Sequence, residues 1–556
     1  MSDKRTADPD PAEEQYDFII VGSGFGGSVS ALRLLEKGYR VLVVEEGRRW
    51  RAHDFPKSNW NVRRFLWMPL LGCHGIQRLD WLGDVLVLGG AGVGGGSLVY
   101  ANMLVVPPAD AFAQGWPGGP GMRERLSPHF ETARRMLGAT PPPALWPAEE
   151  HLRAFARSLG REAQFSQPEV GVLFGAPCGQ EGGQPIPDPY FNGQGPPRAA
   201  CTLCGGCMVG CRHDAKNTLD KNYLYLAEKL GARVLPETRA TLVEPDGNGG
   251  YFVHTRRSTG WPLRARKRLH GQNVILAAGA LGSVDLLLAS KERGTLPRLS
   301  SALGKYLRTN SEIICGARSR AARVDHSQGL AIASDVQADA ETHLQIVRYP
   351  AGSDVMGLLG TLAVAGGGRM PRALRWFARC LGHPLDFLRN LVPVGWAKRT
   401  VVVLAMQSLD NALTLVRKRR WLLGRNLGTR RAMGAPPIPT YLPLANQAAK
   451  FVAERMDGFA LNAINEVLLG VPITAHVLGG ARMGETPEQG VVGPDCRVFG
   501  HPGLWVVDGA VIPANLGANP SLTIAAVAEH AMSHIPVKRQ APSADGDLSG
   551  KGGPGI

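Results

Sequence analysis

A β-α-β pattern near the start constrains the fold of this chain more than any other feature. Residues 16–47 read YDFIIVGSGFGGSVSALRLLEKGYRVLVVEEG. The apolar runs FIIV and VLVV are typical of buried parallel strands, and the stretch between them has helical spacing. A G-x-G-x-x-G motif joins the first run to the helix through Gly22, Gly24 and Gly27. The segment therefore predicts a dinucleotide-binding unit.

Each residue of the motif has a physical task in such a unit. Gly22 permits the tight turn, Gly24 lets the backbone approach a pyrophosphate, and Gly27 allows close packing of helix on strand. The helix start offers N–H groups and a positive dipole end to the phosphates. Glu45 ends the second strand and would accept hydrogen bonds from a ribose. The motif alone does not distinguish NAD from FAD.

Length and composition set the class of protein. A chain of 556 residues is too long for one hydrophobic core, and its 44% hydrophobic and 20% charged residues are those of a globular protein. No apolar run approaches the roughly 18 residues of a membrane span, and the start has no apolar signal region. We expect a cytoplasmic protein with disordered tails at 1–15 and 536–556.

Four segments later in the chain carry a resemblance. They are GGAGVGGGSLVYANM at 89–103, NVILAAGALGSVDLLLAS at 273–290, TAHVLGGARMGE at 474–485 and RVFGHPGLWVVDGAVIPANLGANPSLTIAAVAEH at 497–530. Together with the fingerprint, they resemble the glucose–methanol–choline (GMC) family of FAD oxidoreductases. Within that family they are most similar to cholesterol oxidases of the actinobacterial type. The resemblance covers most of residues 16–535.

The resemblance implies a mixed α/β fold of two parts. One is a Rossmann-like FAD-binding domain, and the other is a discontinuous substrate domain built on an antiparallel sheet plus helices. The FAD-binding domain is expected at 16–50, 85–107, 198–310 and 470–535. The substrate domain is expected at 51–84, 108–197 and 311–469.

The resemblance also implies where FAD binds. We expect the cofactor to be non-covalent, because the loop AGVGGGSLVYANM contains no histidine or cysteine. Tyr100 departs from the cholesterol oxidase pattern, which has asparagine there. The expected cofactor-binding residues are Gly22, Gly24, Phe25, Gly26, Gly27, Glu45, Gly94, Gly95, Gly96, Tyr100, Ala101, Asn102, Met103, Ala240, Gly279, Asp508, Gly509, Pro520 and Ser521.

The implied chemistry is oxidation of an alcohol. The hydroxyl proton must be accepted while hydride leaves carbon for flavin N5, and neutral histidine suits the acceptor role near pH 7. His476 matches the family's active-site histidine, and Asn519 matches its partner. The expected substrate is a hydrophobic secondary alcohol such as a 3β-hydroxysterol, with another hydrophobic alcohol as the alternative. The sequence leaves open whether O2 or another acceptor reoxidises the flavin.

One part of the steroid pattern is missing. Cholesterol oxidases of this class carry a glutamate that moves a proton during double-bond isomerisation. The approximate equivalent lies around Ala397, in PVGWAKRTVVVLAMQ, which contains no carboxylate. Either another acid serves this step or isomerisation is weak.

Four cysteines lie within the stretch CTLCGGCMVGC, at Cys201, Cys204, Cys207 and Cys211. Their C-x2-C-x2-C-x3-C spacing is the run that bacterial ferredoxins use for iron–sulfur clusters. Here Arg212 follows the fourth cysteine where ferredoxins have proline. We expect buried or paired structural thiols and no metal. An iron–sulfur cluster, as in a flavoprotein electron carrier, or a zinc ion is the alternative.

Positive charge is concentrated between residues 370 and 431, where 13 Lys and Arg face two acids. The stretch RALRWFARCL places an apolar face opposite Arg372, Arg375 and Arg379. Two interpretations stand: a helix on a membrane surface, suited to a lipid-dissolved sterol, or a helix packed on its own core. Nucleic acid is not expected as a partner, because no recognition fold accompanies the charge.

Overall fold

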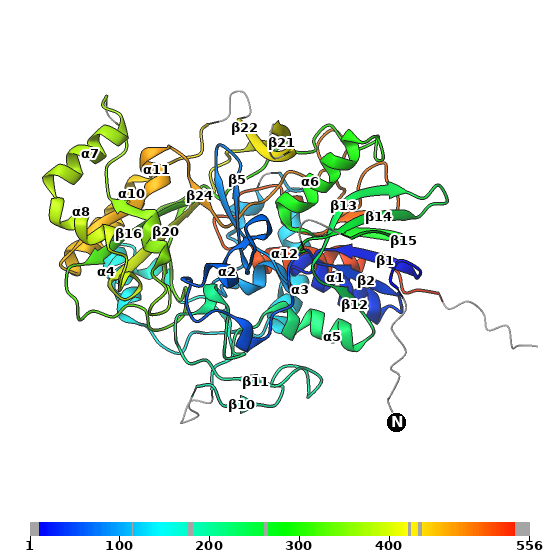
Figure 1. The fold of residues 1–556 in the computed structure, drawn as a ribbon, viewed down its shortest axis with the longest axis horizontal. Coiled ribbons are helices and arrows are strands. Elements are labelled where there is room, and N and C mark those ends of the chain that lie inside the picture. Colours follow the sequence, from blue (N-terminus) through cyan, green and yellow to red (C-terminus); the bar gives the residue numbers. More distant parts are fainter. Residues whose placement is uncertain are drawn as a thin grey trace, which may run out of the picture.

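The fold consists of two seven-stranded sheets at opposite ends of the molecule, with helices packed on both (Figure 1). The computed structural model describes residues 10–539 except 114, 176–181, 261–264, 368, 421–423 and 432–435. Among the described residues, no helix is long and apolar enough to cross a membrane.

The first sheet contains the predicted dinucleotide-binding unit. Its parallel strands run in the order β12-β2-β1-β15, with β25 pairing β15, and β14 and β13 extend it in the antiparallel sense. The apolar runs that predicted strands form them, since Ile19, Ile20 and Leu42 are fully buried. The strands are β1 (Gln15–Val21), β2 (Val41–Val44), β12 (Arg233–Leu235), β13 (Thr238–Pro245), β14 (Tyr251–Arg257), β15 (Arg266–Leu276) and β25 (Leu504–Val506).

Glycines permit the close approach of helix to sheet in this unit. Gly22 has a φ angle of +103°, a backbone conformation that residues with a side chain rarely adopt. A Cβ atom at Gly26 would lie 1.5 Å from the carbonyl oxygen of Val507. The start of helix α1 therefore lies closer to the backbone after strand β25 than a residue with a side chain would allow.

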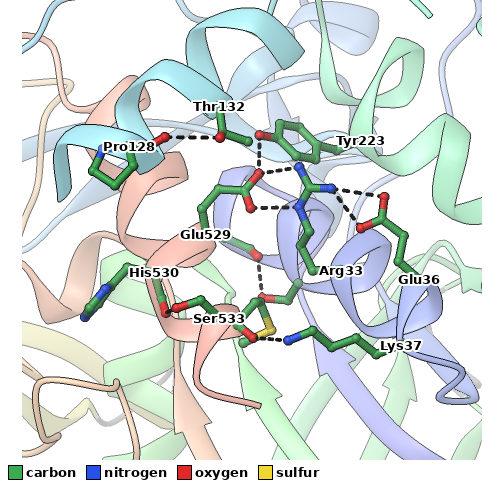
Figure 2. Close-up of polar contacts among 12 residues, drawn as sticks. Arg33, Glu36, Lys37, Pro128, Thr132, Tyr223, Glu529, His530 and Ser533 are labelled. Atoms are coloured by element: carbon green, nitrogen blue, oxygen red, sulfur yellow. Dashed lines mark hydrogen bonds and ion pairs between the residues drawn. The ribbon is translucent and has the colours of Figure 1, made fainter. Parts of the chain in front are cut away.

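Helices from both ends of the chain pack together beside the first sheet. The helices around this sheet are α1 (Phe25–Glu36), α3 (Gly121–Met136), α5 (Tyr223–Lys229), α6 (Gly279–Glu292) and α12 (Ser521–Ser533). Two nitrogens of Arg33 in α1 donate to the carboxylate of Glu529 in α12, at 2.7 and 2.8 Å (Figure 2). The Tyr223 hydroxyl donates to the same carboxylate at 2.7 Å. This network joins the last helix to the first.

The second sheet is antiparallel throughout, in the order β19-β23-β16-β20-β18-β17-β8. Helices α4 (Pro147–Ser158) and α10 (Pro443–Arg455) pack on one face and share a core with it. The strands are β8 (Phe165–Ser166), β16 (Ile313–Ser319), β17 (Asp335–Gln337), β18 (Thr342–Val347), β19 (Gly360–Leu362), β20 (Thr400–Gln407) and β23 (Gly458–Ala463).

Smaller elements join the two sheets. Strands β5 (Gln77–Trp81), β6 (Leu86–Gly90) and β24 (Ile473–Thr474) form a small sheet between them. The hairpin β21 (Leu413–Arg420) and β22 (Gly424–Arg431) lies on α6, where Arg417 contacts Asp285 at 3.2 Å. The remaining helices are α2 (Val62–Phe65), α7 (Arg372–Gly382), α8 (Pro384–Leu391), α9 (Trp396–Arg399) and α11 (Ile464–Leu468).

The predicted fold class is confirmed: a Rossmann-like sheet and a separate antiparallel sheet with helices. The strands of the first sheet come from the ranges expected for FAD binding, apart from the first residue of β1 at 15, and those of the second from 108–197 and 311–469. The exact domain boundaries stay a prediction. Parts of both expected tails contact the first sheet, since Asp10 pairs with Lys267 at 2.7 Å and Lys538 with Asp17 at 2.6 Å.

Candidate active site

A cavity of about 1200 Å³ runs from the first sheet to the open face of the second. Pockets for a single small molecule are commonly about 300–1,000 Å³. This one begins at the carboxyl ends of β1 and β2, where parallel sheets bind ligands. It ends at an apolar wall formed by strands β16, β18 and β20. Its size and shape suit a dinucleotide cofactor with a second molecule beyond it.

The fingerprint loop lines the first end. Gly24 has no atom within 4 Å of a would-be Cβ, so its backbone is open to the cavity. The Glu45 carboxylate accepts the Ser23 hydroxyl at 2.8 Å and the Gly47 N–H at 2.8 Å. Burial raises the pKa of Glu45, against the effect of these hydrogen bonds. Two carboxylate oxygens can accept further hydrogen bonds from a sugar.

The glycine-rich loop 89–103 forms the adjoining wall. Gly95 lies against Gly24, with a would-be Cβ 2.6 Å from the Gly24 Cα atom, and Gly96 has open space before it. The Tyr100 hydroxyl donates to the Asn217 carbonyl at 3.1 Å, so its ring is fixed on the wall. Ser521, the first residue of α12, donates to the Met103 carbonyl at 3.0 Å. The loop is thus held between α1 and α12.

Further predicted residues lie on the same wall. Asp508 follows β25 and accepts the Ala510 N–H at 2.8 Å and the Ser283 hydroxyl at 2.5 Å. Burial raises the pKa of its carboxyl to about 6. Of the 19 residues that we expected at the cofactor, Gly27, Gly94 and Asn102 are absent from the cavity wall. The wall includes Gly22, Gly24, Phe25, Gly26, Glu45, Gly95, Gly96, Tyr100, Ala101, Met103, Ala240, Gly279, Asp508, Gly509, Pro520 and Ser521.

The wall fits a flavin dinucleotide by its chemistry. Glu45 and Asp508 place two carboxylates on the wall, and these can accept hydrogen bonds from the hydroxyl groups of such a cofactor. The backbone at Gly24, Gly96 and Gly279 is open for close contact with a ligand. These residues would hold the cofactor, with its phosphates at the start of α1.

The two predicted catalytic residues meet on this wall. His476 belongs to the segment after β24, and Asn519 lies two residues before the start of α12. The Asn519 amide nitrogen lies 3.3 Å from His476 Nε2, and both side chains line the cavity. They stand between the glycine-rich end and the apolar end. A substrate oxygen reaching this point would meet a base and an amide together.

Glu312, which sequence reasoning missed, is hydrogen-bonded to the other ring nitrogen of His476. Its carboxylate accepts from His476 Nδ1 and, at 2.7 Å, from the Ala475 N–H. Glu312 is 1% exposed. A proton on Nδ1 leaves the lone pair of Nε2 free to act as a base. The only sequence signal was a carboxylate just before the strand IICGARS, 164 residues away from the histidine.

Asn519 is fixed by a second polar contact. Its side-chain oxygen accepts from Gln345 Nε2 at 2.8 Å, and the same nitrogen donates to Asp335 at 3.0 Å. Asp335 also contacts His343 Nδ1 at 2.9 Å. The amide of Asn519 is therefore oriented with its nitrogen toward His476. No motif in the sequence indicated Gln345.

The far end of the cavity is apolar and comes from alternate residues of the second sheet. Along β16 and β20, one set of side chains packs into the core beneath α10 while the other faces the cavity. The apolar lining includes Ile314, Val347, Trp396, Val402, Leu404 and Leu461. The Asp354 carboxylate accepts the Ala397 N–H at 2.8 Å and does not line the cavity.

The cysteine run lies on a separate, small cavity behind the loop 89–103. Cys201, Cys204, Cys207 and Cys211 all line it and are all free thiols. In the described part of the chain, no three His, Cys, Asp or Glu side chains are placed to hold one metal ion.

Comparison with known proteins identifies the family of this chain. Two family models described as GMC oxidoreductase match residues 197–296 and 440–528, and one described as NAD(P)-binding Rossmann-like domain matches 20–62. The chain is 44% identical over 531 residues to a cholesterol oxidase of Acinetobacter baumannii, covering 94% of this chain and 95% of that protein. It is 46% identical over 530 residues to a cholesterol oxidase of Mycobacterium tuberculosis, with 94% and 91% covered.

A solved structure shares the architecture at low identity. An FAD-dependent oxidoreductase from Chaetomium thermophilum superposes with a TM-score of 0.58 at 15% identity, covering 93% of this chain and 98% of that one. This likeness shows the fold alone. The family models and the identity to the cholesterol oxidases along nearly the whole length confirm the resemblance drawn from the motifs. The chain belongs to the GMC oxidoreductase family.

Proposed function

We propose that this protein oxidises a hydrophobic secondary alcohol, a 3β-hydroxysterol such as cholesterol, with FAD as its cofactor. The observation that supports this proposal most directly is the position of His476 Nε2 beside Asn519, between the glycine-rich and the apolar ends of one cavity. The similarity to two cholesterol oxidases supports the sterol. An apolar wall of this extent would accept the rings of a sterol.

The residues divide the work of the reaction. Flavin, when bound, supplies the acceptor for the hydride that leaves the carbinol carbon. His476 Nε2 takes the hydroxyl proton, and Glu312 on Nδ1 fixes the ring and offsets the charge that the ring gains. The Asn519 amide orients the substrate oxygen toward Nε2. The apolar wall keeps water from this end of the cavity, which strengthens each of these polar contacts.

We expect FAD to be bound without a covalent link. Among the described wall residues, the histidine and cysteine are His476 and Cys315. His476 is engaged by Glu312 and Asn519, and the Cys315 thiol donates to the Ala445 carbonyl at 3.2 Å. Acid precipitation of the purified protein should release the flavin into the supernatant. Flavin that sediments with the chain would contradict this expectation.

His476→Ala should slow flavin reduction by about 10²–10⁴-fold, the usual contribution of a general base. Asn519→Ala should slow it less, because it removes orientation and leaves the base in place. The measurement is anaerobic stopped-flow reduction at saturating sterol, with flavin occupancy checked in each variant. A wild-type rate in His476→Ala with full flavin would remove His476 from the mechanism.

Glu312→Gln tests the positioning of the base. Hydrogen bonds to charged groups contribute about 1.5–3 kcal/mol, so the loss of the charge should slow reduction by about 10- to 100-fold. KM and the melting temperature should change little, since glutamine can still accept the Ala475 N–H. A large rise in KM with unchanged kcat would show that Glu312 serves substrate binding instead.

We also propose that α7 and α8 contact a membrane. They form one end of the molecule in Figure 1 and pack on the edge strand β19. The apolar face of each helix is exposed. The interpretation of α7 as a helix packed on its own core through this face is wrong. The side of α7 that faces the protein carries Trp376 and Cys380. The exposed apolar side chains of α7, α8 and the residues beside them, each 54–69% exposed, are Met370, Leu374, Phe377, Leu381, Leu385, Leu388, Leu391, Val392 and Val394.

Charge around this membrane-facing surface, defined as residues 370–394, fits an anionic bilayer. Arg379 and Arg389 are exposed beside the apolar side chains. Arg372 turns inward, donating to the Thr440 carbonyl at 2.7 Å, and does not share the surface as the sequence suggested. The basic hairpin at 413–431 lies on α6, so the proposed contact is narrower than 370–431. Residues 421–423 lie outside the described residues.

The membrane-facing surface adjoins the apolar end of the cavity. Met356 and Leu359 line the cavity, and the short helix that carries them, Val355–Leu359, contacts α8. Leu358 in the same helix is 54% exposed. A sterol leaving a bilayer at α8 would therefore meet an apolar route toward His476.

Phe377→Asp with Leu381→Asp should abolish binding to vesicles of phosphatidylcholine and phosphatidylserine. Turnover of vesicle-borne sterol should fall at least about tenfold, since a charge placed in the apolar contact costs more than 1.36 kcal/mol. Turnover of detergent-dissolved sterol should be unchanged. Leu230→Asp, at a similarly exposed leucine directly after α5, is the matched control and should bind normally. Wild-type protein that fails to sediment with these vesicles at low salt would overturn the proposal.

A further inference from the structure

The four cysteines of the run at 201–211 line a cavity that the proposed alcohol oxidation does not use. Cys201, Cys204, Cys207 and Cys211 converge on one small cavity, although they span eleven residues of irregular chain. All four are free thiols. Cys201 and Cys211 also pack against an apolar core that includes Met103 and Leu330, but core packing alone does not explain why all four thiols line one cavity.

One of the sulfur atoms receives a hydrogen bond from the backbone, since the Leu203 N–H donates to Cys201 Sγ at 3.4 Å. Donors of this kind stabilise thiolates that bind a metal, and they tune iron–sulfur clusters. Leu203 takes a left-handed conformation, φ +56°, which turns the chain around the thiols.

A buried lysine is the independent observation. Lys216 is 1% exposed and lines the same cavity. Its Nζ atom donates to the carbonyls of Leu98, Tyr100 and Cys207 at 3.0, 2.8 and 2.8 Å. Among the described residues it forms no ion pair with a carboxylate. A buried ammonium without a counter-charge is unfavourable, and thiolates bound to a metal centre would supply that charge.

The arrangement of the thiols distinguishes two kinds of metal centre. In the described chain, no three such side chains are placed to share one metal ion, as a tetrahedral zinc site requires. In an iron–sulfur cluster the cysteines bind different iron atoms, so the thiols surround the cluster instead of meeting at a point. The four thiols line one cavity without three of them sharing a metal position, which is compatible with the second arrangement, and the sequence spacing favours it.

The cysteine cavity lies directly behind the proposed flavin site. Lys216 bonds to two carbonyls of the loop 89–103, which forms the wall of the large cavity. Met208, between the third and fourth cysteines, also lines the large cavity. The two cavities are therefore separated by little more than this loop and the Lys216 side chain.

We propose that Cys201, Cys204, Cys207 and Cys211 hold an iron–sulfur cluster beside the flavin. The Lys216 ammonium offsets the negative charge of the cluster. The inference rests on the proposed function only in placing the flavin. Iron and sulfide are measured without any alcohol, so the two proposals fail independently.

The test is the metal content of the full-length protein, produced with added iron and purified without oxygen. Wild-type protein should contain about two to four iron atoms per chain, with a similar amount of acid-labile sulfide. It should give the electron paramagnetic resonance signal of a cluster after reduction or oxidation. FAD-replete protein that takes up neither iron nor sulfide during anaerobic reconstitution, or that binds one zinc instead, would overturn the proposal.

Variants locate the cluster. Cys204→Ser with Cys207→Ser should reduce iron and sulfide to background while FAD stays bound, and Cys73→Ser, a half-buried cysteine outside the run, should retain both. Flavin reduction by sterol under anaerobic conditions should be the same in all three proteins, because hydride transfer does not involve the thiols. Full iron and sulfide in the double variant would place the metal elsewhere. If the double variant loses FAD, Cys201→Ser and the wild-type analysis decide the question.

Discussion

The bidentate ion pair between Arg33 and Glu529 is the contact on which the geometry of the site depends (Figure 2). It fastens helix α12 to helix α1, although 496 residues separate the two partners. The start of α1 presents the glycine loop to the cavity, and the turn before α12 presents Asn519. Breaking a buried pair by removal of one partner leaves an uncompensated charge, at a cost of about 3–5 kcal/mol. The relative position of cofactor loop and reactive amide is therefore maintained by a contact outside the cavity.

The reactive end is a chain of polar groups that spans both sheets. Glu312 directly precedes β16, His476 follows β24, Asn519 precedes α12, and Gln345 belongs to β18. Each side chain has its orientation fixed by the next, which is how a buried polar network specifies one arrangement. The base and the amide thus come from the Rossmann part, while their supports come from the antiparallel sheet. Only the assembled molecule has a complete site.

Local patterns in the sequence predicted the first β-α-β unit, and the family resemblance predicted the residues of the candidate site. The glycine motif and the apolar runs predicted β1, α1 and β2, and the matched segments predicted that His476 and Asn519 would share a site. The partners Glu312 and Gln345 could not be predicted, because their contacts depend on the register of strands distant in sequence. Periodicity also predicted that α7 has an apolar face. It contains no information on whether another element covers that face, and in this fold none of the described elements does.

The alternation of side chains along β16 and β20 has an evolutionary consequence. Ile313, Val401 and Val403 belong to the core under α10, whereas their neighbours Ile314, Val402 and Leu404 face the cavity. The second group packs against a different core, which includes Met103 and Leu330, so substitutions there change the shape offered to the alcohol and leave the core under α10 intact. The core under α10 and the shape of the cavity are thus encoded at different positions of the same strands. A lineage built on this sheet can exchange one bulky alcohol for another while the packing of α10 on the sheet is conserved.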